Sequence, residues 1–360
     1  MKVLRVGLDE RSYNIHIGSY LLPDLGALCR ELPLKGRAAV ITNTTVATLY
    51  LSQIQKSLES EGYDVTVIEL PDGEEFKNSA TLEMIYDALI SAGLDGGSFI
   101  VALGGGVVGD MAGFAAATFL RGIPFVQVPT TLLAQVDSSV GGKTGINHRL
   151  GKNLIGAFYQ PRMVLADLDT MDTLPEREYL CGLAEVLKYG VVLDREFFDF
   201  ISAEVNSLKM RDKKALLHTV ARSCAIKASV VERDEREGGL RAVLNYGHTI
   251  GHAVETLAGY GSIKHGEAVA IGMAQIAKLS CMRGFSTGSD MDLIINLIRN
   301  LGLPDILPDF PLSEYQKIIE KDKKKRDGGV NFIFNRGIGD FVIESVADIG
   351  SLLCRCRESV

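Results

Sequence analysis

Hydrophobic and polar positions follow two different patterns along the chain, and the change falls near residue 175. In the first half, short apolar runs rich in β-branched residues predict strands at 37–43, 63–70, 98–106 and 123–131. Stretches with helical spacing of apolar residues lie between them, at 44–62 and 78–95. Gly62 is expected to end the first helix, and Asn78 or Ser79 to cap the second. Strands that alternate with helices favour a mostly parallel α/β sheet.

After residue 175 the pattern becomes helical. Helices are predicted at 176–192, 195–207, 211–232, 247–258, 266–283 and 289–301, with a short β-rich patch at 330–344. The fold class is therefore α/β, with a Rossmann-like N-terminal domain at 1–174 and a mainly helical C-terminal domain at 175–360. We expect the active site in the cleft between them.

Composition restricts the partners. The chain has 360 residues, 46% of them hydrophobic and 23% charged, which is typical of a globular protein. Its net charge of −7 gives no reason to expect nucleic acid or a membrane as partner. The six cysteines form no CxxC pair, and we assign no role to Cys354 and Cys356. Without a signal peptide or a long apolar run, the expected location is the cytoplasm.

A glycine-rich stretch, GGGVVGD (104–110), follows the predicted strand FIVAL. Gly104, Gly106 and Gly109 satisfy GxGxxG, a spacing that lets the backbone approach a phosphate at a helix N-terminus. The acidic residue expected about 20 positions later in a dinucleotide fold is absent, and Arg121 and Gly122 occupy that region. We favour phosphate binding over the alternative, a tight strand–helix turn packed with glycine.

A second candidate anion site lies at 138–156, where Lys143 and Lys152 stand among glycines. The P-loop pattern fails because Asp137 occupies the position of its first glycine, which disfavours a nucleoside triphosphatase. Lysines among glycines suit a flexible loop that folds over a phosphorylated ligand, and equally a solvated basic loop. Asp137 itself fits either an N-cap or turn position, or a hydrogen bond to a ligand hydroxyl.

Half of the chain's six histidines fall within 248–265. His248 and His252 share one helix face, and His265 is predicted in a loop just before a helix that starts at Gly266. The segment HTIGH lacks the glutamate of HExxH, which argues against a protease. Three imidazoles, or two with a carboxylate such as Glu185, suit a zinc-like ion. The alternative for Glu185 is an ion pair with Lys188, three residues later.

These features occur together in one known family. The chain resembles 3-dehydroquinate synthase over nearly its full length, and the order of the matching segments agrees. The segments are DGEEFK (72–77), the block 104–161 from GGGVVGD to GAFYQP, GLAEVLKYG (182–190), RAVLNYGHTIGHAVE (241–255), HGEAVAIGM (265–273) and KDKK (321–324).

The resemblance implies a homodimeric sugar-phosphate cyclase, a lyase that depends on NAD and on a divalent metal, zinc or cobalt. Its substrate would be 3-deoxy-D-arabino-heptulosonate 7-phosphate, and its products 3-dehydroquinate and phosphate, a step of the shikimate pathway towards chorismate. The metal ligands implied are Glu185, His248 and His265. His252 becomes a proton-transfer residue instead of a ligand.

The resemblance also assigns the other contacts. The implied cofactor contacts are Asn43, Asp72, Gly73, Glu74, Glu75, Phe76, Lys77, Gly106, Val107, Val108, Gly109, Asp110, Thr130, Thr131, Lys143, Lys152, Thr170, Met171, Asp172 and Thr173. The implied substrate contacts are Asp137, Lys143, Asn153, Lys188, Lys227, Arg241, Asn245 and Lys324, with Arg121 reaching across the dimer interface.

The implied reaction oxidises the substrate at C5 with NAD, eliminates phosphate, returns the hydride, opens the ring and closes it by an intramolecular aldol step. Arg241 is expected to grip the substrate carboxylate, and His252 and Asp137 to shuttle protons. Three alternatives remain: another sugar-phosphate cyclase, a metal-dependent polyol or glycerol-phosphate dehydrogenase, and a binding protein without chemistry.

Overall fold

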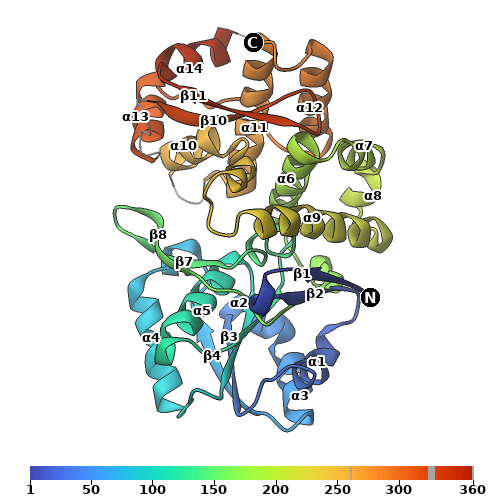
Figure 1. Ribbon diagram of the computed structural model, residues 1–360, viewed down its shortest axis with the longest axis vertical. Coiled ribbons are helices and arrows are strands. Elements are labelled where there is room, and N and C mark those ends of the chain that lie inside the picture. Colours follow the sequence, from blue (N-terminus) through green and yellow to red (C-terminus); the bar gives the residue numbers. More distant parts are fainter. Residues whose placement is uncertain (260–261, 323–328, 359–360) are drawn as a thin grey trace. The chain divides into compact units, whose positions relative to one another are not determined.

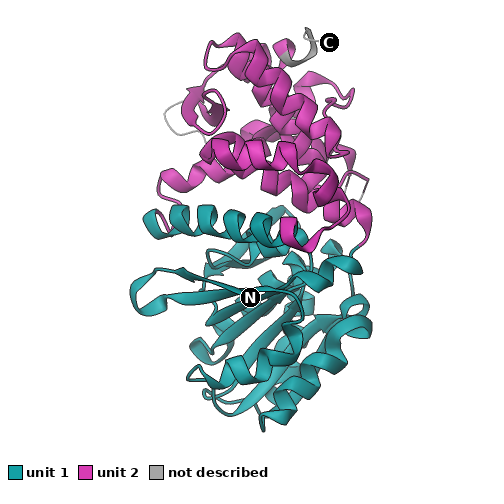
Figure 2. Cartoon of the chain, turned by 90° about the vertical axis from the view of Figure 1, so that its right-hand side faces the viewer, with its two compact units in different colours: residues 1–174, 216–233 teal, residues 175–215, 234–360 magenta. Residues whose placement is uncertain are grey.

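The computed structural model describes residues 1–259, 262–322 and 329–358. The chain packs as two compact units, one of residues 1–174 with 216–233 and the other of residues 175–215 with 234–360 (Figure 2). The segment 216–233, which follows the start of the second unit in the chain, thus belongs to the first. The functions assigned to the predicted domains, 1–174 and 175–360, stay predictions.

The first unit is built on a seven-stranded sheet with the order β1-β2-β9-β6-β5-β3-β4. β1 pairs with β2 antiparallel, and every other neighbouring pair is parallel, which confirms the predicted α/β class. The strands are β1 (Lys2–Val6), β2 (Tyr13–Gly18), β3 (Arg37–Asn43), β4 (Asp64–Leu70), β5 (Phe99–Gly104), β6 (Phe125–Pro129) and β9 (Met163–Asp167), and β7 (Lys143–His148) and β8 (Gly151–Phe158) form a separate hairpin.

The helices of this unit cover both faces of the sheet (Figure 1). They are α1 (Leu25–Arg30), α2 (Thr44–Val46), α3 (Ser52–Ser60), α4 (Ser79–Ser91) and α5 (Gly106–Thr118). Alternate strand residues face opposite ways: Ile41 and Ala102 pack with α4 and α5, whereas Val40 and Val101 pack with α1 and α3. Burial on both faces explains why these strands read as continuous apolar runs.

The connections of the sheet diverge between β3 and β5, its two adjacent central strands. The chain leaves β3 through α3 to β4 on one side, and leaves β5 through α5 to β6 on the other. α3 and α5 pack in the cores of opposite faces. Such a divergence opens a crevice at the carboxyl ends of the strands, where open α/β sheets bind ligands.

The second unit is mainly helical, as predicted, with one two-stranded hairpin. Its elements are α6 (Glu176–Leu193), α7 (Arg195–Ala203), α8 (Val205–Lys209), α10 (His248–Ala258), α11 (His265–Met282), α12 (Gly288–Asn300), α13 (Leu312–Asp322), β10 (Val330–Asn335), β11 (Phe341–Val346) and α14 (Ile349–Glu358). The long helix α9 (Lys213–Arg233) begins in this unit and continues into the first.

Several predicted elements differ in detail. The predicted helix 44–62 contains a π-helical turn at Ala47–Leu51, and the predicted helix 195–207 divides at Glu204. The lysine-rich segment predicted as a flexible loop is largely the β7–β8 hairpin. The β1–β2 hairpin and the helices α13 and α14 were not predicted. In the part of the chain that the structure describes, no helix is long and apolar enough to cross a membrane.

The N-cap of α4 allows a test of how much a single capping residue stabilises this fold. The side chain of Asn78 accepts a hydrogen bond from the backbone N–H of Thr81 at 3.1 Å, whereas Ser79 is exposed. Asn78→Ala should lower the free energy of unfolding by about 1 kcal/mol in urea denaturation, because that N–H loses its partner. The control Ser79→Ala should change it by less than about 0.5 kcal/mol. Equal effects would contradict the assignment of the cap.

Candidate active site

Three side chains from separate helices converge in the second unit. Glu185 comes from α6, His248 from the start of α10 and His265 from the start of α11. Oε1 of Glu185 lies 3.3 Å from Nε2 of His248 and 3.6 Å from Nε2 of His265. Their ligand atoms all lie within 4.8 Å of one another, close enough to bind one metal ion. A carboxylate with two imidazoles is a donor set typical of catalytic zinc sites, which leave a coordination position open for substrate.

The second nitrogen of each histidine ring has its own partner. Nδ1 of His248 lies 3.0 Å from the carbonyl oxygen of Tyr246, and Nδ1 of His265 lies 3.3 Å from Oε2 of Glu255. Partners at Nδ1 fix the tautomer, so that both Nε2 atoms face Glu185. Sequence reasoning missed Glu255, although it lies three residues after His252 on the face that carries the histidines.

Burial and pairing set the charges of the three groups in the metal-free protein. Burial alone raises the pKa of Glu185, but the Lys188 ammonium and the His248 imidazole outweigh it and hold that pKa well below its usual value. Burial lowers the pKa of His248 to about 4 against the opposing pull of Glu185. Burial also lowers the pKa of His265, but hydrogen bonds to Glu185 and Glu255 outweigh the effect of burial and raise that pKa to about 9. Of the two histidines, only His265 therefore carries a positive charge at neutral pH.

Glycines let the helices approach closely enough for their side chains to meet. A Cβ on Gly266 would lie 2.3 Å from the carbonyl oxygen of Cys181 in α6, and one on Gly272 would lie 1.9 Å from that of Gly247. Neither position accepts a larger residue unless the backbone shifts. The metal centre therefore depends on backbone contacts that bring α11 against α6 and against the start of α10.

The structure settles some of the open alternatives at this centre and corrects one prediction. His265 is the first residue of α11, not part of a loop. Glu185 does pair with Lys188, whose side chain is buried, so this ion pair accompanies the histidine cluster. The His252 ring lies 5.5 Å from that of His248 and 5.9 Å from that of His265, measured between centroids. Among the described residues the metal-binding group comprises Glu185, His248 and His265 without His252.

The predicted cofactor residues other than Lys143 and Lys152 lie at one edge of the first unit's sheet. Asn43 ends β3, residues 72–77 follow β4, the glycine loop follows β5, Thr130 and Thr131 follow β6, and residues 170–173 follow β9. Because these strands are parallel, all five segments meet at their carboxyl ends. We call this set of loops the cofactor edge.

The glycine loop presents an uncapped helix terminus at this edge. α5 begins at Gly106, and its N-cap Gly105 contributes no side-chain hydrogen bond. The first N–H groups of the helix and its positive dipole end thus suit a phosphate ligand. The loop is a tight turn between β5 and α5, as the alternative prediction for these glycines described. The same turn is compatible with phosphate binding.

Polar contacts tie the cofactor edge together. Nδ2 of Asn43 donates to Oδ1 of Asp72 at 2.7 Å, and the hydroxyl of Thr45 donates to Oδ2 of the same carboxylate at 2.7 Å. Nζ of Lys77 lies 2.6 Å from Oδ2 of Asp110 on α5. Burial raises the pKa of Asp110, although Lys77 pulls it down. The hydroxyls of Tyr50 and Thr173 share a hydrogen bond, which links 170–173 to the segment after β3.

The predicted substrate residues of the first unit occupy three places. Asp137 lies within the π-helical turn η6 (Ala134–Ser138), so it is a turn residue, as one alternative predicted, and not an N-cap; its carboxylate pairs with Lys227 of α9 at 2.9 Å. Lys143 and Asn153 lie on the β7–β8 hairpin, which also carries Lys152, a predicted cofactor contact. Arg121 is exposed and has a left-handed backbone with φ of 66°.

The remaining substrate residues belong to the second unit. Arg241 is buried, 1% exposed, and its guanidinium donates to the carbonyl oxygen of Glu235. Nδ2 of Asn245 lies 3.4 Å from Oε1 of Glu237. Lys324 lies outside the described residues.

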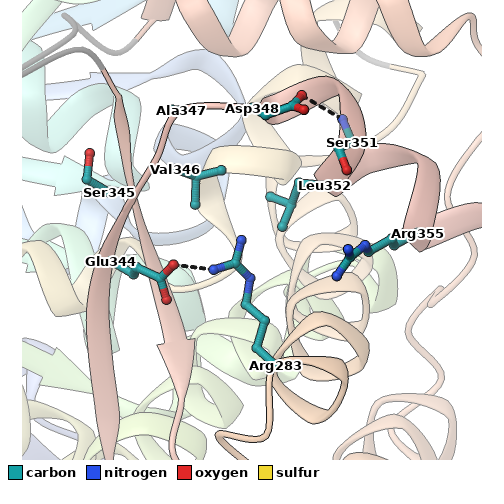
Figure 3. A pocket seen from close by; sticks show the side chains of 9 residues that line it. All are labelled: Arg283, Glu344, Ser345, Val346, Ala347, Asp348, Ser351, Leu352 and Arg355. Atoms are coloured by element: carbon teal, nitrogen blue, oxygen red, sulfur yellow. Dashed lines mark hydrogen bonds and ion pairs between the residues drawn. The ribbon is translucent and has the colours of Figure 1, made fainter.

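The second unit also contains a polar cavity of about 220 Å³ between β11 and α14 (Figure 3). In it Arg283 pairs with Glu344, and Asp348 accepts from the N–H of Ser351. Its described lining includes none of the predicted site residues.

Comparisons with known proteins agree with this geometry. Residues 67–181 match the sequence model of the 3-dehydroquinate synthase N-terminal region, and residues 182–325 match that of the C-terminal region. A curated relative from Geotalea uraniireducens (strain Rf4), named 3-dehydroquinate synthase, is 64% identical over 99% of each chain.

Two solved structures share the whole fold. ValA, the 2-epi-5-epi-valiolone synthase of Streptomyces hygroscopicus subsp. jinggangensis 5008, was solved with NAD⁺ and Zn²⁺. It superposes with a TM-score of 0.89 at 29% identity, covering 98% of this chain and 99% of that one. A 2-deoxy-scyllo-inosose synthase with carbaglucose-6-phosphate, NAD⁺ and Co²⁺ gives 0.90 at 27% identity, covering 99% and 100%.

The charges of the metal centre predict a proton-linked metal affinity. A metal ion needs the neutral imidazole of His265, whose pKa is about 9, whereas His248, with a pKa of about 4, is already neutral. Binding of Co²⁺ to the metal-free protein at pH 7.5 should therefore release about one proton, and affinity should rise with pH up to about 9. Calorimetry in two buffers of different ionisation enthalpy measures the proton number.

Two variants control this measurement. His148→Ala, which changes an exposed histidine of the β7–β8 hairpin, should leave the proton number unchanged. Glu185→Ala should abolish tight binding, because a carboxylate ligand is lost. Tight binding by wild type with no proton release would contradict the charge state that we assign to His265.

Proposed function

Because this chain belongs to the 3-dehydroquinate synthase family, we propose that its metal centre and its cofactor edge serve a single substrate, a sugar acid phosphate. The enzyme is a carbon–oxygen lyase that converts 3-deoxy-D-arabino-heptulosonate 7-phosphate to 3-dehydroquinate and phosphate. The observation that carries the assignment of residues is the convergence of Glu185, His248 and His265 on one point.

The residues present fit both cofactors of the solved relatives. Glu185 is buried, and its Oε1 faces two imidazole nitrogens whose rings are already oriented, a donor set that suits Zn²⁺ or Co²⁺. The uncapped start of α5 and the loops at the carboxyl ends of the parallel strands suit the pyrophosphate of NAD. When bound, NAD would accept and return the hydride at C5 while the metal ion acted as a Lewis acid there.

The protein's own side chains neutralise and orient an anionic substrate. Arg241 would take the carboxylate through its planar guanidinium, and Lys143, Asn153 and Lys324 would hold the phosphate. Lys188, Lys227 and Asn245 would orient the hydroxyl groups. These cations explain how a protein with a net charge of −7 binds a ligand that carries both a carboxylate and a phosphate.

We assign proton transfer to two side chains, His252 and Asp137. The His252 ring lies 5.5 Å and 5.9 Å from the rings of the two histidine ligands without belonging to the metal-binding group, a position that suits proton transfer at the substrate oxygen. Asp137 pairs with Lys227 at 2.9 Å, and its side chain is partly exposed. The later ring closure is intramolecular and requires positioning more than additional groups.

We propose that the enzyme acts as a homodimer in the cytoplasm. The supporting feature is Arg121, a guanidinium exposed at a strained turn between α5 and β6. The family resemblance assigns this residue to the phosphate site of the other subunit. Left-handed residues other than glycine are uncommon, and they persist where the surrounding structure holds a side chain in place for function.

An assay that follows two products tests the reaction. Enzyme with metal, catalytic NAD⁺ and 3-deoxy-D-arabino-heptulosonate 7-phosphate should release phosphate stoichiometrically while absorbance at the NADH wavelength stays flat, because the hydride returns in each turnover. NADH that accumulates in step with substrate loss would indicate a dehydrogenase instead. Removal of the metal by chelation should abolish phosphate release, and Zn²⁺ or Co²⁺ should restore it.

Complementation tests whether Arg121 acts across the dimer. Arg121→Ala and Glu185→Ala should each be inactive alone. In a mixed dimer, the chain with the intact metal centre would receive Arg121 from the other chain. Random mixing should therefore restore about a quarter of wild-type activity, since half of the dimers are mixed and each has one complete site. No recovery, with mixed dimers verified by tagged co-purification, would place Arg121 in its own subunit's site.

A further inference from the structure

The β7–β8 hairpin contains an irregularity at Asn147. Ile146 pairs with Ile155 and His148 pairs with Gly151, so three residues of β8, 152–154, lie opposite the single residue Asn147, and the extra residues of the bulge are on β8. A bulge of this kind redirects a side chain and commonly lies next to a functional site. The backbone N–H of Asn147 donates to the carbonyl oxygen of Lys77 at 2.8 Å.

The side chain of Asn147 uses both ends of its amide. Nδ2 donates to Oε1 of Glu74 at 2.8 Å, and Oδ1 accepts from the backbone N–H of Asn153 at 3.0 Å. Glu74 and Lys77 belong to the cofactor edge, whereas Asn153 lies near the start of β8. One residue thus connects the turn after β4 to the position of Asn153.

The backbone of Asn153 is also part of this arrangement. Its φ is 53°, a left-handed conformation that asparagine adopts more readily than most residues with a side chain. The bond from its N–H to Asn147 holds that conformation. Nζ of Lys77 donates to Oδ1 of Asn153 at 2.6 Å, and this ammonium is itself anchored by Asp110.

These contacts fix which end of the Asn153 amide is available. With Oδ1 taken by Lys77, the Nδ2 group is left to donate, and among the described residues no hydrogen bond from it is found. A donor attracts a phosphate oxygen, whereas a rotated amide would present Oδ1 and repel it.

We infer that Asn147 is a positioning residue of the substrate-phosphate site, which acts by holding Asn153 in its left-handed conformation with its amide nitrogen available. The inference rests on the proposed role of Asn153 as a phosphate contact. Asn147 touches neither phosphate nor cofactor in this scheme. It links the β7–β8 hairpin to the turn at 74–77 through hydrogen bonds, so the position of the phosphate contact depends on the cofactor edge.

The test uses Asn147→Ala in the full-length, metal-loaded enzyme. This change keeps the backbone bond to Lys77 and removes both side-chain bonds. The KM for substrate and the inhibition constant of inorganic phosphate should each rise about tenfold, the equivalent of one to two hydrogen bonds. The turnover number, the NAD dissociation constant without substrate and the metal content should stay within about threefold of wild type. His148→Ala, one residue further along the hairpin, is the matched control and should change none of these values.

A double variant distinguishes positioning from general damage. If Asn147 acts through Asn153, then Asn147→Ala/Asn153→Ala should bind phosphate as weakly as Asn153→Ala alone, within about twofold, because the two effects are not additive. Fully additive losses would overturn the inference. So would an unchanged inhibition constant in Asn147→Ala, or an equal loss of NAD affinity and metal, which would indicate disrupted structure.

A different result would contradict the proposed function. If wild type released no phosphate from the sugar acid, that function would be wrong whatever Asn147 does. If wild type is active and only the Asn147 predictions fail, the inference alone is wrong.

Discussion

A buried carboxylate is the constraint on which the catalytic half of this protein depends. Glu185 is 1% exposed in the middle of an apolar helix, where an isolated negative charge would be prohibitive. It is held ionised by Lys188 and by the two histidines, and in turn it draws His248 and His265 to one point. The same groups that make the charge tolerable in the metal-free protein form the donor set for a cation. Structural stability and metal binding are therefore properties of one cluster.

The two units bring their site residues together in different ways. The first uses parallel strands whose carboxyl ends bring five separate segments to one edge, so that short loops suffice to build a cofactor site. The second brings helices together at glycines, where the absence of a side chain at Gly266 and Gly272 lets backbone meet backbone. In both units glycines mark the site in the sequence: the glycine loop before α5 in the first unit, and Gly266 and Gly272 in the second. The chemistry comes from a few polar residues nearby.

Local patterns predicted the elements better than their connections. Apolar runs and caps located the central strands and most helices, and the histidine spacing located the metal centre. The role of Glu255 was not predicted, because it depends on where α10 and α11 meet, and the placement of His265 at a helix start instead of a loop depended on the same packing. The lysine-rich segment was mistaken for a flexible loop because its glycines concealed the pairing of β7 with β8. The bulge of β8 opposite Asn147 was likewise not predicted, since nothing in the sequence alone marks residues that a ladder leaves unpaired.

The segment 216–233 limits where the chain can be cut into independent parts. It joins the first unit through contacts such as Lys227 with Asp137 and the Cys224 thiol with the carbonyl of Gln135, yet the chain on either side of it belongs to the second unit. The polypeptide thus passes from one unit to the other at 174/175, again at 215/216 and once more at 233/234. A fragment ending at residue 174 would lack a helix of its own core, and the remainder would carry that helix without its partner. Neither piece is an interchangeable module, and dissection or gene fusion at that point would yield two incomplete proteins.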